Sequence, residues 1–306
     1  MVDASEMGTH LVFYLESGVA RPCQLETLDA KTFNRKAEKN RMKPLKVVAL
    51  RSLILAAFIF TPRLALSFCH EMEVVGRPSV RLAATNGPRV EIEWFGHATF
   101  QITSSKGTRV LADPHSRSDL RWPNQPQHIV TTSHQHGAHN NTYMAKGNPV
   151  ILHGLTSGGE NWQKVSTTIR DVSVYLVPAY HDKSQGLQRG KNAIFVFRVD
   201  DVCIAHLGDL GHVLTPAQLK LMGKIDVLLV PVAGGMFTVT PDEAVEVTKQ
   251  INPKIAIPEH YWWPGGADRF AAGFSKVKRL NGPSLKISKQ ELPQPIEIVV
   301  LDDGGR

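Results

Sequence analysis

Short β-type runs recur between residues 90 and 262, and several of them end at a histidine or an aspartate. His181 follows the run 176–180, Asp209 lies just after the run 202–207, and His260 follows the strand predicted at 254–258. Because ligand-binding side chains gather where neighbouring strands end, we expect these residues to meet at one edge of a sandwich. This feature constrains the fold more than any other in the chain.

A histidine-rich loop follows the strand predicted at 128–132. It reads Ser133-His134-Gln135-His136-Gly137-Ala138-His139-Asn140-Asn141 and places three imidazoles within six residues. Such a cluster is hard to bury in an apolar core, and imidazole is the commonest metal-ligating side chain near neutral pH. The loop therefore predicts a metal site.

The remaining pattern indicates an α/β layered domain with two sheets and outer helices. The first three strands read as an antiparallel meander, and the run 226–232 is apolar almost throughout, as in a strand covered on both faces. Helices are predicted to start at Thr215-Pro216 and Thr240-Pro241, the second with Glu243 in a capping box. Strands are predicted at 90–94, 99–103, 108–113, 128–132, 173–177, 193–199, 202–207, 226–232 and 254–258.

Composition excludes several classes of protein. With 42% hydrophobic and 21% charged residues, the chain is globular rather than disordered. Its formal charge of +7 divides into +4 over residues 1–67 and +3 over the rest, so the globular part has no basic stripe for nucleic acid. Three cysteines cannot build a disulfide framework, and no CxxC pair suggests a zinc ribbon.

The N-terminal segment resembles an export signal. Basic residues from Met42 precede the apolar stretch 52–60, and Ala65-Leu66-Ser67 offers small residues for cleavage after Ser67. We expect residues 1–41 to be a mis-annotated extension, 42–67 a signal peptide, 68–89 a linker and 90–306 the globular domain. The apolar stretch is short for a stable membrane span. A periplasmic or secreted location follows, with a membrane-anchored or cytoplasmic protein as the alternative.

Beyond these patterns, the chain resembles the metallo-β-lactamase superfamily of metal-dependent hydrolases over about residues 90–262. Within it, the chain is most similar to the branch of ascorbate-6-phosphate lactonase and the N-acylphosphatidylethanolamine phospholipase D type enzymes. The resemblance implies a four-layer αββα sandwich. The residues that carry it are 94–99 (WFGHAT), Asp113-Pro114, His134 to His139, His181, Gly208-Asp209 and 257–261 (IPEHY).

The resemblance also implies a ligand set and a chemistry. One or two divalent ions are expected, Zn²⁺ first, with Mn²⁺ or Fe²⁺ as alternatives. A metal-bound hydroxide would attack an ester, lactone, amide or phosphodiester of a small-molecule substrate. The first metal would be bound by His134, His136 and His181, the second by His139 and His260, and Asp209 would bridge the two.

One position departs from the family motif His-x-His-x-Asp-His. Ala138 stands where the aspartate belongs, which removes a ligand of the second metal and the group that orients the attacking water. Two readings follow. The protein is a hydrolase in which Asp209 or Asp182 supplies the base, or it is a catalytically silent relative that binds a metal or a ligand.

Further candidates surround this constellation. His97 is expected beside the site, with a catalytic or a structural role. Arg189, Lys191 and Asn192 could bind an anionic group of the substrate or simply form a solvated turn. Trp262 could line an apolar pocket or pack as core. No periodic apolar face predicts an oligomeric state.

Overall fold

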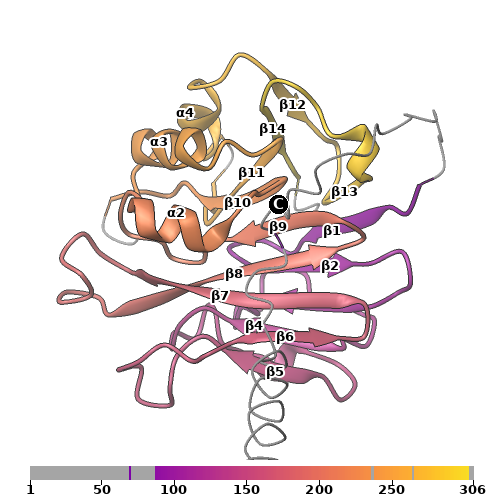
Figure 1. The fold of residues 1–306 in the computed structure, drawn as a ribbon, viewed down its shortest axis with the longest axis vertical. Coiled ribbons are helices and arrows are strands. Elements are labelled where there is room, and N and C mark those ends of the chain that lie inside the picture. The colour runs from indigo at the N-terminus through magenta and orange to yellow at the C-terminus, as the bar shows by residue number, and fades with distance from the viewer. Residues whose placement is uncertain (1–68, 70–86, 236–237, 264, 303–306) are drawn as a thin grey trace, which may run out of the picture. The chain divides into compact units, whose positions relative to one another are not determined.

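Two mixed β-sheets and the helices beside them form the described part of the chain (Figure 1). The structure is a computed structural model, and it describes residues 69, 87–235, 238–263 and 265–302. The segments predicted as extension and signal peptide lie outside these residues. The two sheets confirm the α/β class of the metallo-β-lactamase type.

The first sheet has the strand order β13-β1-β2-β3-β4-β5. Strands β1, β2 and β3 form the predicted antiparallel meander, whereas β3, β4 and β5 run parallel. Its strands are β1 (Val90–Trp94), β2 (Phe100–Thr103), β3 (Arg109–Ala112), β4 (Ile129–Thr132), β5 (Val150–His153) and β13 (Ser284–Ile287).

The second sheet has the order β12-β14-β11-β10-β9-β8-β7-β6. Its β6 to β9 half is antiparallel, and β9, β10, β11, β14 and β12 run parallel. The central β10 is fully buried, as its apolar run predicts. The strands are β6 (Ser166–Ile169), β7 (Val172–Tyr180), β8 (Lys191–Val199), β9 (Val202–His206), β10 (Val227–Pro231), β11 (Ile255–Glu259), β12 (Val277–Arg279) and β14 (Glu297–Val300).

Among the described residues, helix α2 (Pro216–Met222) packs against β7 and α3 (Pro241–Ile251) against β10 of the second sheet, and the short α4 (Asp268–Ala271) packs against α3 (Figure 1). The 3-10 turns of the described residues are η1 (Thr142–Met144) and η2 (Lys289–Glu291). Both predicted helix starts are confirmed. Thr215 and Thr240 each form a capping box, with Gln218 and Glu243 respectively, and proline follows each cap.

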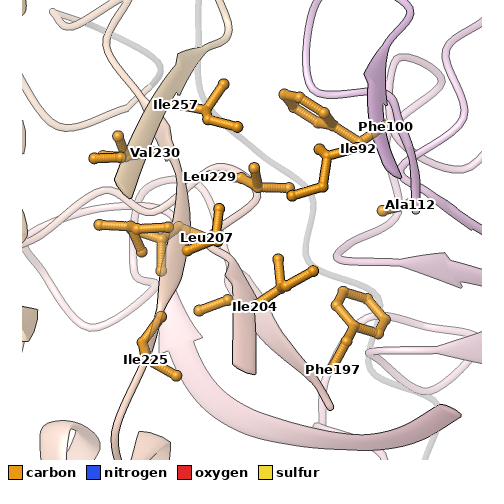
Figure 2. Close-up of a cluster of buried hydrophobic side chains, with 14 of the residues drawn as sticks. Ile92, Phe100, Ala112, Phe197, Ile204, Leu207, Ile225, Leu229, Val230 and Ile257 are labelled. Carbon is orange, nitrogen blue, oxygen red and sulfur yellow. The ribbon is translucent and has the colours of Figure 1, made fainter. Parts of the chain in front are cut away.

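The apolar core lies between the two sheets (Figure 2). Side chains of β1, β2 and β3, including Ile92 and Phe100, face those of β8, β9 and β10, including Phe197, Ile204 and Leu229. All five are fully buried. This packing fixes the two sheets against each other, and therefore fixes the strand ends that carry the polar residues.

A disulfide joins Cys69 to Cys203 in β9, with 6.0 Å between the two Cα atoms. Both residues are buried, and the Cys69 carbonyl accepts a hydrogen bond from the backbone N–H of Lys224. The sequence excluded a disulfide framework but gave no sign of this single bond, because its partners are 134 residues apart. Cys69, placed in the expected linker 68–89, is thus attached to the second sheet.

None of the helices in the described ranges is long and apolar enough to cross a membrane.

Candidate metal centre

Five predicted site residues lie just beyond the carboxyl ends of strands. His97 follows β1, His134 follows β4, His181 follows β7, Asp209 follows β9 and His260 follows β11. All five are buried. From the sequence we expect strand ends to bring these five side chains together, and the structure places them at strand ends of both sheets.

Asp209 stands at the centre of the cluster, and each of its carboxylate oxygens faces two histidines. Oδ2 lies 3.5 Å from His134 Nε2 and 3.1 Å from His181 Nε2. Oδ1 lies 3.1 Å from His139 Nε2 and 3.0 Å from His260 Nε2. A carboxylate divided between two imidazole pairs would be able to bind a cation held by either pair.

Asn192 of β8 makes two hydrogen bonds to the loop that carries Asp209. Its side-chain amide donates to the Leu207 carbonyl at 2.8 Å and its oxygen accepts the Asp209 N–H at 3.1 Å. Gly208 has a positive φ of 55°, and a Cβ there would lie 2.7 Å from the Ser133 Cβ. Asn192 is fully buried, so its geometry favours positioning Asp209 over the expected contact with substrate.

Asp113, which follows β3, orients His139 from the opposite side. Its Oδ2 lies 2.8 Å from His139 Nδ1, and its Oδ1 accepts the Ser133 backbone N–H at 2.7 Å. This hydrogen bond directs His139 Nε2 toward Asp209, as metal-ligating histidines require. The sequence marks Asp113 only as part of the family resemblance and does not predict this role, although Asp113 follows a strand as Asp209 does.

Electrostatics in the cluster differ between its two sides. Burial lowers the pKa of His134 to about 3, so this imidazole is neutral. Burial also acts to lower the pKa of His139, but Asp209 and Asp113 outweigh it and raise the pKa to about 10. Burial alone would raise the pKa of Asp209, whereas His139 and His260 hold it well below its usual value. The centre therefore favours positive charge beside Asp209.

The residues present fit a divalent metal. Nitrogen or oxygen atoms of the site that are buried without a hydrogen-bond partner are His97 Nδ1, His134 Nε2, His139 Nε2, His181 Nδ1, Asp209 Oδ1 and His260 Nδ1. Leaving such atoms unpaired is costly, and an imidazole–carboxylate donor set suits Zn²⁺, Mn²⁺ or Fe²⁺. Three groups have ligand atoms within 4.8 Å of one another: His134, His181 and Asp209; His134, His136 and His139; and His97, His139 and His260.

His136 and Ala138 occupy the outer part of the histidine loop. His136 is exposed, and its ring stacks parallel to that of His134 at 5.9 Å. Ala138 is partly buried and carries no ligand atom. The predicted first set of His134, His136 and His181 is thus divided between two of the geometric groups, which share His134.

Asp182 has a different function from the base that the sequence suggested. Its carboxylate accepts backbone N–H groups of Ser184 at 2.7 Å, Gly186 at 2.9 Å, Gln188 at 3.0 Å and Arg189 at 2.7 Å. Burial acts to raise the pKa of Asp182, but these four hydrogen bonds lower it overall. A carboxylate so occupied organises the loop after His181 and is a poor proton acceptor.

The other substrate candidates, Arg189, Lys191 and Trp262, differ in what they contact. The Lys191 ammonium donates to the Glu160 carbonyl and lies 4.8 Å from the centre of the Trp162 ring, while Arg189 is exposed. Trp262 stacks on His97 with ring centroids 5.5 Å apart and is 38% exposed. Of these residues, Trp262 contacts the histidine cluster and offers an apolar wall to a bound molecule.

Two mixed sheets with a buried histidine–carboxylate centre at their strand ends are the arrangement of the metallo-β-lactamase class of fold. Residues 91–260 match the family described as "Beta-lactamase superfamily domain". A UPF0173 protein of Pyrococcus abyssi is 32% identical over 201 residues, covering 61% of this chain and 90% of its own. A UPF0173 metal-dependent hydrolase of Thermococcus kodakarensis is 29% identical, covering 65% and 95%.

Solved structures agree with this assignment. A candidate Zn-dependent hydrolase of the superfamily from Thermotoga maritima is 36% identical, with a TM-score of 0.56, covering 69% of this chain and 98% of its own. A candidate metal-dependent hydrolase from Parabacteroides distasonis, 18% identical with a TM-score of 0.53 and coverage of 71% and 95%, shares the fold. The chain belongs to the metallo-β-lactamase superfamily and, within it, to the UPF0173 metal-dependent hydrolase family.

Proposed function

We propose that this protein hydrolyses a small ester, lactone or phosphodiester with the help of two divalent ions, Zn²⁺ first. One observation carries the proposal: the carboxylate of Asp209 directs one oxygen to His134 and His181 and the other to His139 and His260. The similarity to candidate Zn-dependent and metal-dependent hydrolases supports the reaction class. The sequence motifs of the lactonase-like branch support the choice of substrates.

Each residue of the centre has a task in this proposal. His134, His136 and His181 would hold the first ion, His139 and His260 the second, and Asp209 both. The bound ions would supply Lewis acidity, which acidifies water and polarises the scissile bond. Asp113 keeps His139 in the tautomer whose Nε2 faces the ion, and Asn192 keeps Asp209 in register.

Trp262 limits the shape of the substrate in the same proposal. Its ring covers His97 and lies 5.4 Å from the His260 ring. A substrate whose apolar part rests on this indole would place its polar bond over the histidines and exclude water from one side.

Metal content and turnover, measured together, test the proposal. The purified protein, loaded with Zn²⁺ or Mn²⁺, is assayed by elemental analysis and with a panel of lactones, aryl esters and phosphodiesters. Asp209→Asn should lower turnover by at least about 100-fold and reduce the bound metal. His153→Gln, a change at an exposed histidine outside the cluster, is the matched control and should leave both unchanged. A wild-type protein that binds no metal would contradict the proposal.

Ala138 favours a second candidate function, in which the protein is a catalytically silent relative of these hydrolases and binds a metal or a ligand without turnover. The residue has no carboxylate to orient water, and Asp182 is unavailable as a replacement base. Ala138→Asp separates the two candidates. Turnover that appears only in this variant supports the silent relative, whereas turnover already present in the wild type supports the hydrolase.

We also propose that the protein is exported and matures in an oxidising compartment. The signal-like segment 42–67 supports export, and the disulfide between Cys69 and Cys203 is a bond that reducing compartments disfavour. N-terminal sequencing of the protein from its native cells tests this proposal. A mature chain beginning near residue 68 supports it, and one beginning near Met1 contradicts it.

A further inference from the structure

His97 is attached to the centre through its backbone. The residue has a positive φ of 53°, a conformation that a side chain of this size adopts at a cost. Its carbonyl accepts two hydrogen bonds, from the indole N–H of Trp94 at 2.9 Å and from the backbone N–H of His260 at 3.0 Å. His260 itself has a positive φ of 60°. The two strand ends thus fix each other, and strain is retained at this point.

The imidazole of His97 lies among aromatic rings of the cluster. Its centroid is 4.1 Å from that of His260 and 4.8 Å from that of His139, and Trp262 stacks on it at an interplanar angle of 10°. The residue is only 6% exposed. Packing from several sides leaves the ring little freedom to turn away from the other two histidines.

Nitrogen atoms of three buried histidines converge at this point. One ligand nitrogen from each of His97, His139 and His260 lies within 4.8 Å of the others. His97 Nδ1 is buried without a hydrogen-bond partner, as is His139 Nε2. Since an unpaired buried nitrogen is costly, the arrangement calls for a group that several imidazoles can share.

We propose that His97 is a direct ligand of the second divalent ion, together with His139, His260 and Oδ1 of Asp209. Three nitrogens and one oxygen complete a four-ligand set of the kind that Zn²⁺ accepts. In this chain His97 therefore supplies the ligand that Ala138 cannot. The inference rests on the proposed metal-dependent function and adds to it that the second site is complete without an aspartate at 138.

Metal binding, rather than turnover, tests the proposal. His97→Gln, His153→Gln and wild-type protein are titrated with Zn²⁺, and the bound metal is measured by elemental analysis after gel filtration in a metal buffer. In His97→Gln the second ion should bind at least tenfold more weakly while the first is retained. His153→Gln, altered at an exposed histidine that bonds Thr132, should bind both ions as the wild type does.

A second variant distinguishes loss of a metal ligand from a general loss of folding. His97→Cys is loaded with Co²⁺, and a thiolate-to-cobalt charge-transfer band in the near ultraviolet should appear that the wild type lacks. Such a band places residue 97 on the ion directly. If His97→Gln keeps both ions at wild-type affinity and His97→Cys gives no band, the ligand role is overturned, even where turnover is lost. A wild-type protein without bound metal would instead overturn the proposed function itself.

Discussion

At the scale of single residues, Asp113 offers a test of how the centre is oriented. Replacing it with asparagine removes the charge that faces His139 Nδ1 and leaves a single acceptor oxygen where His139 and the Ser133 backbone N–H now use one each. We expect Asp113→Asn to weaken metal binding by about 10- to 100-fold, because an imidazole without its carboxylate partner is a poorer and less ordered ligand. Isothermal titration with Zn²⁺ measures this. Asp242→Asn, in an exposed ion pair with Arg269, is the control, and equal affinities in the two variants would refute the role.

The pKa values predict that metal uptake is coupled to proton release. Without metal, His139 has a pKa of about 10 and is protonated at neutral pH, whereas His134, with a pKa of about 3, is neutral. A ligating His139 must lose its Nε2 proton, so the affinity of its site should rise about tenfold per pH unit between pH 7 and 9. Titrations in buffers of different ionisation enthalpy should show that protons are released as the metal binds, and that His139→Gln reduces this release.

The role of a single residue could be predicted where neighbouring residues in the sequence indicate it, and could not where it depends on contacts made only in the folded chain. His134, His139, His181, Asp209 and His260 each follow a recognisable strand, and the structure brings them together. The positioning roles of Asp113 and Asn192 depend on hydrogen bonds across 26 and 15 residues of sequence. No spacing rule reports such contacts, so these roles became visible only in the folded chain.

At the scale of elements, the loop between β7 and β8 is organised by one side chain. Asp182 accepts four backbone N–H groups from residues 184–189, directly after His181. We expect Asp182→Asn to destabilise the protein by about 2–3 kcal/mol at neutral pH, because an amide offers fewer acceptors and no charge. Asp201→Asn, at an exposed turn, should change stability by less than about 0.5 kcal/mol.

The difference in stability between the wild type and Asp182→Asn should depend on pH in a definite direction. The pKa of Asp182 is lowered in the folded state, so its stabilisation is fully present above the carboxyl's unfolded pKa, near pH 4. It is lost as pH falls through the lower folded pKa. Urea unfolding from pH 7 downward should therefore show the wild type and Asp182→Asn converging only below about pH 4. A gap that is independent of pH would contradict this account.

Most elements with strong periodic or apolar signals could be predicted, with the apolar β14 as an exception, and elements with weak signals could not. The strand of residues 226–232 and the two capped helices appear nearly as expected. No strand is predicted from the sequence at β6, whose residues are Ser-Thr-Thr-Ile, or at β12, whose three residues are all exposed. Such strands form because an edge of the sheet is available, which is a property of the tertiary structure rather than of the segment.

At the scale of the whole molecule, the disulfide connects Cys69 to the strand that precedes Asp209. Cys203 is the second residue of β9, and the bond closes a loop spanning 134 residues of sequence. Closing a loop of this length restricts the unfolded chain and stabilises the fold by about 2–5 kcal/mol. Because the disulfide lies in the hydrophobic core and not in the candidate metal centre, we expect it to affect folding more than metal affinity.

Reduction should therefore lower the melting temperature of the wild type without removing its metal. The matched control is the double variant Cys69→Ser, Cys203→Ser, which should melt at the lower temperature with or without reductant. Scanning calorimetry of both proteins, with and without dithiothreitol, followed by elemental analysis, makes the measurement. If reductant lowers the double variant's melting temperature as much as the wild type's, the reductant acts elsewhere, for example on the metal. If instead reductant changes the melting temperature of neither protein, the disulfide contributes nothing to stability. The proposal that the protein matures in an oxidising compartment then has no support from the stability of its fold.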